Sequence, residues 1–226
     1  MGFWSGLGSV CSTIGSAISG ACSVVSSAIS SIGDALGRGA LSLLGLNPTI
    51  IEAVIAVVQI VAQLLGVTKE DESPEELGDK AVRSDKKPEN FNTTEEYITY
   101  LREDVDFDQE EFDKLSDEEK LARNAIGTAI SMKGISEKKD FAISLDTWAT
   151  MAKLYNKDLL NQDNLDGFID EFKENQTELN GYVNKEIKGA KGVEVAKKLA
   201  EAYQKLEPEL STDAINDKVL NSKIAE

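Results

Sequence analysis

Residues 47–66 read NPTIIEAVIAVVQIVAQLLG, and this stretch predicts a single apolar helix with clear ends. Asn47 is a favoured N-cap residue, Pro48 suits the first helical position, and Gly66 interrupts the apolar pattern. A helix of this length spans about 28 Å, close to the roughly 30 Å hydrocarbon core of a bilayer. We therefore predict a membrane or assembly face made of Ile51, Val54, Ile55, Val58, Val61 and Leu65.

Three polar side chains interrupt this helix. Glu52, Gln59 and Gln63 lie at offsets of 0, 7 and 11 residues, which places them on one narrow stripe. A single span surrounded by lipid does not favour such a stripe, whereas a bundle with a polar seam or lumen does, and so does a helix lying on a surface. The alternative is a core helix of a soluble oligomer whose stripe is in contact with water.

Upstream, apolar residues recur in steps of three and four over residues 3–36, the spacing of an amphipathic helix. The opposite face carries serine and glycine and almost no charge. Serine and glycine are weak helix formers, so this segment needs an apolar surface to pack on. The second part of the predicted membrane or assembly face is Phe3, Trp4, Leu7, Val10, Ile14, Ile18, Val25, Ile29, Ile32 and Leu36.

Two surfaces fit this helix. A Ser/Gly polar face opposite an apolar face resembles the amphipathic helices that sense lipid packing, and Trp4 suits a membrane interface. Small residues also let helices approach closely, so copies of the chain could pack together along it. The intervening residues 39–46 are short enough to make the two apolar segments a helical hairpin.

Charge divides the chain into two parts. Residues 1–66 contain only Asp34, Arg38 and Glu52 as charged side chains, whereas residues 67–226 carry 38 acidic and 23 basic residues. We therefore expect an apolar arm over residues 1–66, an acidic linker and loop over 67–92, and an acidic helical domain over 93–226.

The acidic part reads as several short helices. Capping boxes begin at Ser73, Thr93 and Ser116, each followed three residues later by glutamate. No stretch shows the alternation of period two that marks strands, so the predicted fold is all-α, with the apolar helical hairpin followed by an acidic multi-helix domain. Four apolar stripes at helical spacing follow the third capping box, and they begin at Leu121, Leu145, Leu165 and Val193.

Composition excludes several classes of function. The 226 residues include 40 acidic and 24 basic side chains, a net charge of −16, which disfavours nucleic acid as a partner. The chain has no histidine and two cysteines, which removes histidine-based catalysis and common zinc sites. Asp104-Val-Asp106-Phe-Asp108 and Asn164-x-Asp166-Gly167 only partly match calcium loops. We predict no enzymatic activity, no catalytic residue, no metal and no cofactor.

The leading hypothesis is a membrane-active, self-associating protein of the penetration or pore-forming type, viral or delivered as an effector. Its partners would be a lipid bilayer, other copies of the chain, and an unknown protein on the acidic domain. The alternative is a structural subunit of a virion, tube or filament, with the arm buried between protomers. An acidic mimic of nucleic acid would leave the arm unexplained. No basic segment precedes the apolar residues, so we expect synthesis in the cytoplasm, followed by association with a membrane or a particle.

Overall fold

The computed structural model describes residues 4–223, with side chains from Ser16 onward. No strand occurs within these residues, which confirms the predicted all-α class. The chain forms two compact units, unit 1 (Met1–Asp140) and unit 2 (Phe141–Glu226).

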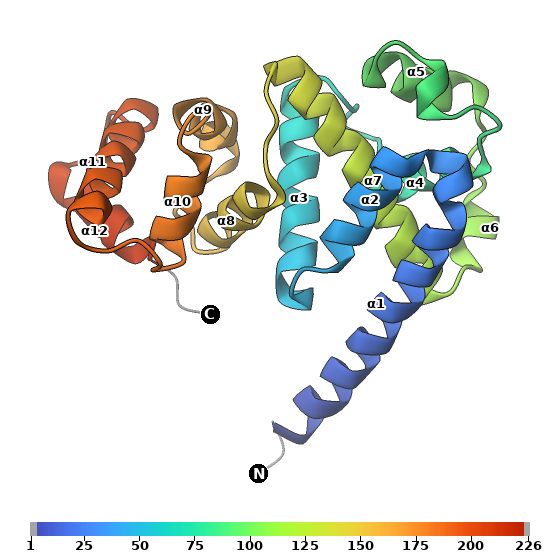
Figure 1. The fold of residues 1–226 in the computed structure, drawn as a ribbon, viewed down its shortest axis with the longest axis horizontal. Coiled ribbons are helices and arrows are strands. Elements are labelled where there is room, and N and C mark those ends of the chain that lie inside the picture. The colour runs from blue at the N-terminus through green and yellow to red at the C-terminus, as the bar shows by residue number, and fades with distance from the viewer. Residues whose placement is uncertain (1–3, 224–226) are drawn as a thin grey trace. The chain divides into compact units, whose positions relative to one another are not determined.

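Unit 1 is built from seven α-helices among the described residues (Figure 1). They are α1 (Trp4–Ile32), α2 (Asp34–Leu44), α3 (Pro48–Leu64), α4 (Pro74–Arg83), α5 (Thr94–Asp104), α6 (Gln109–Asp113) and α7 (Asp117–Lys139). The 3-10 turn η1 (Pro88–Asn90) lies between α4 and α5.

Helix α7 is the centre of unit 1, and α1, α2, α3 and α4 all pack against it. Figure 1 shows α7 passing behind α2. Between Ala122 and Ile135 it is buried on almost every side. Seven of its ten buried residues are alanine, glycine, serine or threonine, and their small size lets four neighbouring helices approach one axis.

Helices α4 and α7 approach each other so closely that their backbones are in contact. A methyl group on Gly78 would lie 1.8 Å from the carbonyl oxygen of Arg123, and one on Gly127 would lie 1.9 Å from that of Pro74. Real Cβ atoms do not approach other atoms so closely, so only glycine fits at either position.

A buried carboxylate lies beside this crossing. The side chain of Asp79 is 1 % exposed, and its oxygens lie 2.8 Å from Arg83 Nε and 3.3 Å from Arg123 Nε. Arg123 Nη1 is buried without a hydrogen-bond partner, so the charge of Arg123 depends on Asp79 for compensation.

Asp79→Ala is expected to lower the free energy of unfolding by about 3 kcal/mol, because it leaves the buried guanidinium of Arg123 uncompensated. Denaturant unfolding followed by circular dichroism measures the loss. The matched control is Glu111→Ala, which removes the exposed ion pair with Lys114 and should cost less than about 0.5 kcal/mol. Equal losses in the two variants would show that Asp79 has no special role.

The predicted helix starts are confirmed. Asn47 caps α3 by accepting a hydrogen bond from the backbone N–H of Thr49, with Pro48 in the first turn. Ser73, Thr93 and Ser116 each accept from the N–H of the glutamate three residues later, and they begin α4, α5 and α7. These starts depend on local chemistry, which explains why the sequence reveals them.

The apolar N-terminal region differs from the predicted two-helix hairpin, because it forms three helices. Gly33, with φ 80° and ψ 150°, ends α1 and turns the chain into α2, so Leu36 belongs to α2. Most of residues 39–46, expected to be a connection, also lie in α2. The positive φ of Gly33 is a backbone conformation that glycine adopts without strain, which favours glycine at this turn.

The compact units divide at a different place from the predicted boundary after residue 66. Helices α1, α2 and α3 pack on α7, a helix from the acidic part of the sequence, so unit 1 contains both parts. The expected acidic linker over residues 67–92 contains α4, and Val67 and Thr68 are buried. Burial raises the pKa of Glu72, but hydrogen bonds and the charge of Arg102 outweigh it and leave that pKa lowered.

Unit 2 consists of α8 (Leu145–Tyr155), η2 (Gln162–Asn164), α9 (Leu165–Glu171), α10 (Gln176–Val183), α11 (Gly189–Leu206) and α12 (Thr212–Asn221). Its core includes Trp148, Phe168 and Tyr203. The buried carboxylate of Glu207 accepts hydrogen bonds from Lys218 Nζ at 2.6 and 2.7 Å and from Asn164 Nδ2 at 2.6 Å, which ties α12 to η2. Asn164, which begins the second partial match to a calcium loop, therefore has a structural partner in this unit.

Candidate functional site

Helix α1 carries one apolar stripe along its length. In its C-terminal half, Ala21, Val25, Ala28 and Ile32 are buried against unit 1, where α1 contacts α2, α4 and α7. Ile18 and Ile29 are half-buried at the margins of the stripe. The opposite face is exposed and consists largely of serine: Ser16, Ser19, Ser23, Ser26, Ser27 and Ser30. Within this half, the predicted apolar face is thus a core face of unit 1.

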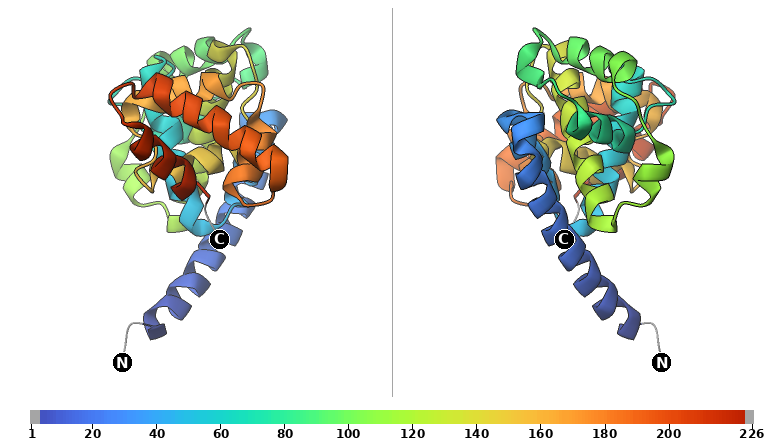
Figure 2. Two further views of the ribbon diagram at one scale, coloured as in Figure 1. Left: turned by 90° about the vertical axis from the view of Figure 1, so that its left-hand side faces the viewer. Right: turned by 90° about the vertical axis from the view of Figure 1, so that its right-hand side faces the viewer.

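The same stripe continues toward the N-terminus of α1. Leu7, Val10 and Ile14 precede Ile18 at intervals of three and four residues, so helical spacing places them in line with Val25 and Ile32. Figures 1 and 2 show this part of the α1 ribbon extending beyond the other helices of unit 1. For Trp4, Leu7, Val10 and Ile14 the structure describes only the helical backbone, and Phe3 lies outside the described residues.

A small apolar depression marks the place where α1 leaves the other helices. It has a volume of about 190 Å³ and lies where α1 meets the N-terminal ends of α3 and α7. It is lined by Ala17, Ile18, Pro48, Ile51, Glu52, Asp117 and Leu121. The apolar surface of unit 1 therefore continues along α1 as far as Ala17 and Ile18.

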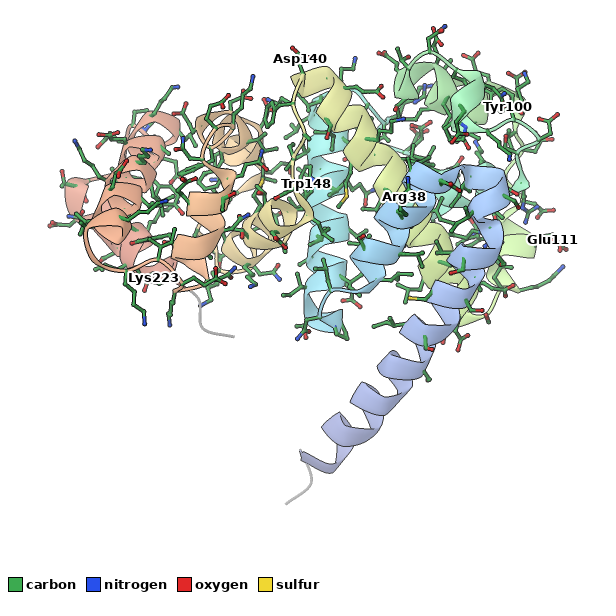
Figure 3. The ribbon with its side chains drawn as sticks, in the orientation of Figure 1. Arg38, Tyr100, Glu111, Asp140, Trp148 and Lys223 are labelled. Carbon is green, nitrogen blue, oxygen red and sulfur yellow. The ribbon has the colours of Figure 1, made fainter. Side chains whose placement is uncertain are left out.

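The side chains of α1 carry no formal charge. The first charged side chain in the sequence is Asp34 and the next is Arg38, which is exposed on α2 (Figure 3). Helix α1 itself therefore contains no Asp, Glu, Lys or Arg side chain.

Helix α3 does not present its apolar face to the surroundings. Ile51, Val54, Ile55, Val58 and Val61 are buried in unit 1, and Leu65 is half-buried. Helices α2 and α7 contact α3, and the small residues of α7 provide the room for its branched side chains. The predicted membrane or assembly face of α3 thus lies in the core of unit 1.

The predicted polar stripe of α3 lies on the opposite, outer side of that helix. Glu52 is exposed, as is Ala56 between it and the glutamines, while Gln59 and Gln63 are half-buried. Gln63 Nε2 donates a hydrogen bond to the carbonyl oxygen of Glu70, 3.2 Å away, and so holds the turn that follows α3. The polar stripe therefore lies on the outer side of α3, whereas the apolar side of the same helix is packed in the core.

No helix within residues 4–223 is long and apolar enough to cross a membrane. Nor does this part of the chain bring together three side chains able to hold a metal ion. Asp108, at the fifth position of the partial calcium loop, is the N-cap of α6 and accepts a hydrogen bond from Glu111 N–H at 3.1 Å. Its carboxylate therefore has a structural partner in the first turn of a helix.

Comparison of the chain with protein-family models, curated proteins and solved structures gives no match. Function must therefore be inferred from physical features. The strongest such feature of unit 1 is the apolar stripe of α1, which is buried from Ala21 to Ile32 and whose spacing continues in the sequence toward Trp4.

Proposed function

We propose that this protein is a non-enzymatic protein that associates with membranes and with copies of itself. In the membrane-bound state, the N-terminal half of α1 would lie on the bilayer surface. The observation that carries the proposal is the continuity of the α1 stripe. Its C-terminal half packs on α7, and the same spacing of apolar residues continues over Leu7, Val10 and Ile14, beyond the other helices of the unit. An amphipathic helix gains free energy when its apolar face is buried in the acyl region.

The chemistry of the helix supports a lipid surface with packing defects. Its polar side offers serine and glycine in place of lysine, so attraction to anionic headgroups contributes nothing and apolar burial must supply the binding energy. The residues from Trp4 to Gly15 cover about 18 Å of helix, enough for three turns in the interface. Trp4 begins the helix, and tryptophan favours the boundary between headgroups and acyl chains.

Surface association is favoured over a pore made by α3. An α3 that inserted with Glu52, Gln59 and Gln63 toward a lumen would have to leave its contacts with α2 and α7. That step would expose the core of unit 1, whereas α1 can engage lipid with the packing of α3 intact.

A structural subunit is the second candidate function. The serine-rich face of α1 favours it, because small side chains let two helices approach closely. In that function, the N-terminal halves of α1 from several copies would cover one another, and the acidic surfaces would face outward.

Tryptophan emission distinguishes lipid contact from assembly. The chain has two tryptophans, and Trp148 is fully buried in unit 2, so it provides a constant background. Adding small zwitterionic vesicles with unsaturated chains is expected to shift the emission to shorter wavelength and to protect it from acrylamide, because Trp4 leaves water.

The control is Trp4→Phe, in which the vesicle-dependent shift should disappear while the Trp148 emission stays. A spectrum that changes with protein concentration and not with vesicles would favour the structural subunit instead. A vesicle-dependent shift that persists in Trp4→Phe would contradict a role for the start of α1.

A further inference from the structure

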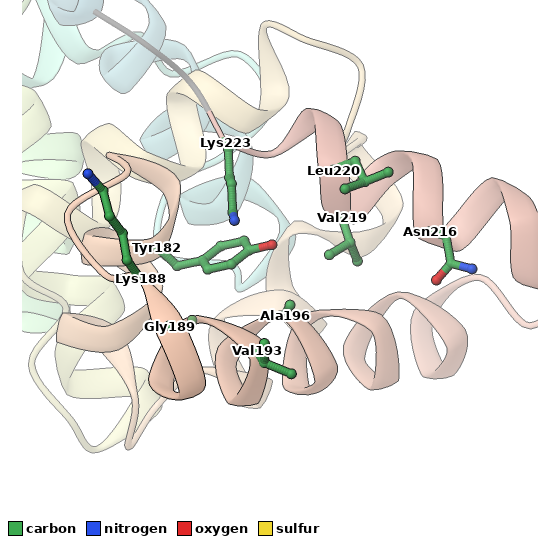
Figure 4. A pocket seen from close by; sticks show the side chains of 10 residues that line it. Tyr182, Lys188, Gly189, Val193, Ala196, Asn216, Val219, Leu220 and Lys223 are labelled. Carbon is green, nitrogen blue, oxygen red and sulfur yellow. The ribbon is translucent and has the colours of Figure 1, made fainter.

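Unit 2 contains an open groove with an apolar floor. It has a volume of about 660 Å³ and lies between α11 and α12, with Tyr182 of α10 at one end (Figure 4). Val193 and Ala196 of α11 line one side, and Val219 and Leu220 of α12 line the other. Asn216 lies at the end away from Tyr182.

The groove is bordered by unusually exposed apolar side chains. Val193 is 71 % exposed and Leu220 is 68 % exposed, and among the described residues the only other large hydrophobic side chain with a comparable exposure is Leu64, at 47 %. The sequence pattern had placed Val193 at the start of a core stripe, but the structure buries Val195 of the same helix instead. Two exposed apolar side chains facing one groove indicate a surface that a partner covers.

The charged side chains that line the groove are both lysines, although the chain as a whole carries −16. Lys188 and Lys223 line the Tyr182 end, and Lys223 Nζ lies 4.6 Å from the centre of the Tyr182 ring. Neither lysine forms an ion pair within residues 4–223. Their charges are therefore available to an acidic ligand.

The start of α11 adds to this local charge. The other four α-helices of unit 2 each have an acidic residue in the first turn, whereas α11 begins at Gly189 with none. The N-terminal end of an α-helix is the positive end of its dipole, and here no carboxylate in the first turn offsets it.

We propose that this groove binds a short amphipathic helix of a partner protein, with apolar residues along one face and acidic residues at one end. The apolar face would lie between Val193 and Leu220, and the acidic end would lie next to Lys188 and Lys223. Helix α12 is 10 residues long, about 15 Å, so the groove accommodates two to three turns of the partner.

A flat anionic bilayer fits this surface less well. The groove is concave, and the exposed acids Glu194 and Asp217 follow directly after lining residues of α11 and α12. These carboxylates would face the headgroups of a flat bilayer, whereas a narrow helix between α11 and α12 can avoid them. The proposal concerns unit 2 and does not depend on the function proposed for α1.

Selection from a displayed library of random peptides of about 16 residues, on the immobilised full chain, tests the proposal. We expect enriched peptides with apolar residues at helical spacing and Asp or Glu near one end. Lys188→Glu with Lys223→Glu should weaken their binding at least about tenfold, and so should Val193→Asp with Leu220→Asp.

The matched control is Lys157→Glu with Lys205→Glu, two exposed lysines of unit 2 outside the lining of the groove, which should change binding by less than about twofold. The proposal is overturned if no peptide is enriched, if the enriched peptides lack acidic residues, or if they bind the groove variants and the control equally. Lys188→Glu with Lys223→Glu could instead lose binding to anionic vesicles and keep its peptide binding. That result would assign the surface to lipid and would also overturn the proposal.

Discussion

Gly127→Ala is expected to lower the free energy of unfolding by at least about 3 kcal/mol, although alanine normally stabilises a helix by about 1 kcal/mol relative to glycine. The added methyl group would lie 1.9 Å from the carbonyl oxygen of Pro74, and a backbone atom cannot rotate away as a side chain can. Helices α4 and α7 must therefore separate, which disturbs the helix that contacts α1, α2 and α3 as well. Denaturant unfolding followed by far-ultraviolet circular dichroism measures the loss.

Gly39→Ala is the matched control, because Gly39 of α2 faces the same central helix α7. Its methyl group would lie 3.3 Å from Cβ of Ala129, a side-chain contact that a small adjustment relieves, so we expect a change within about 1 kcal/mol. If Gly127→Ala were as stable as the parent chain, the close crossing of α4 and α7 would be wrong. Gly78→Ala provides an independent check, because its methyl group meets the backbone of α7 from the other side.

Val10→Lys with Ile14→Lys is expected to weaken binding to zwitterionic vesicles at least about a hundredfold. Each substitution removes an apolar side chain worth about 1.5 kcal/mol or more when buried, and about 1.4 kcal/mol corresponds to a factor of ten. The lysines also place charge on the face that the proposal puts in the acyl region. A vesicle titration at fixed protein concentration gives the two binding constants.

The matched control is Ser9→Lys with Ser12→Lys, which adds the same charge to the serine-rich side of α1. Because that side faces water in the bound state, we expect a change of less than about threefold on uncharged lipid. Equal losses in the two double variants would mean that binding does not depend on the apolar stripe.

The sequence was most informative where structure depends on neighbouring residues. Asn47 and Ser116 mark helix starts through hydrogen bonds that span two or three residues, and both starts are found where they were expected. The all-α class follows equally directly from the spacing of apolar residues.

Sequence reasoning could not identify which helix covers which. The apolar face of α3 has the same pattern whether it meets lipid, another copy or α7, and only the tertiary structure shows that α7 covers it. The break after Ile32 was missed for a similar reason. Gly20 lies inside α1 and Gly33 ends it, and the difference lies in the contacts around each residue.

The two candidate sites differ in how far the sequence revealed them. The uncharged stripe of α1 can be predicted from residue spacing alone, because one helix carries all of it. The groove of unit 2 could not be predicted in this way. Lys188 and Lys223 are far apart in the sequence, and the apolar spacing of α11 had indicated Val193 as a core residue. The absence of an acidic residue in the first turn of α11 was the one available signal.

Flotation of the intact chain with small zwitterionic vesicles tests the central claim most directly. The proposed function predicts that the protein rises with the vesicles, that Val10→Lys with Ile14→Lys remains in the bottom fraction, and that Ser9→Lys with Ser12→Lys rises like the parent. An intact chain that stays in the bottom fraction at every lipid concentration, while forming regular particles of its own, would contradict it.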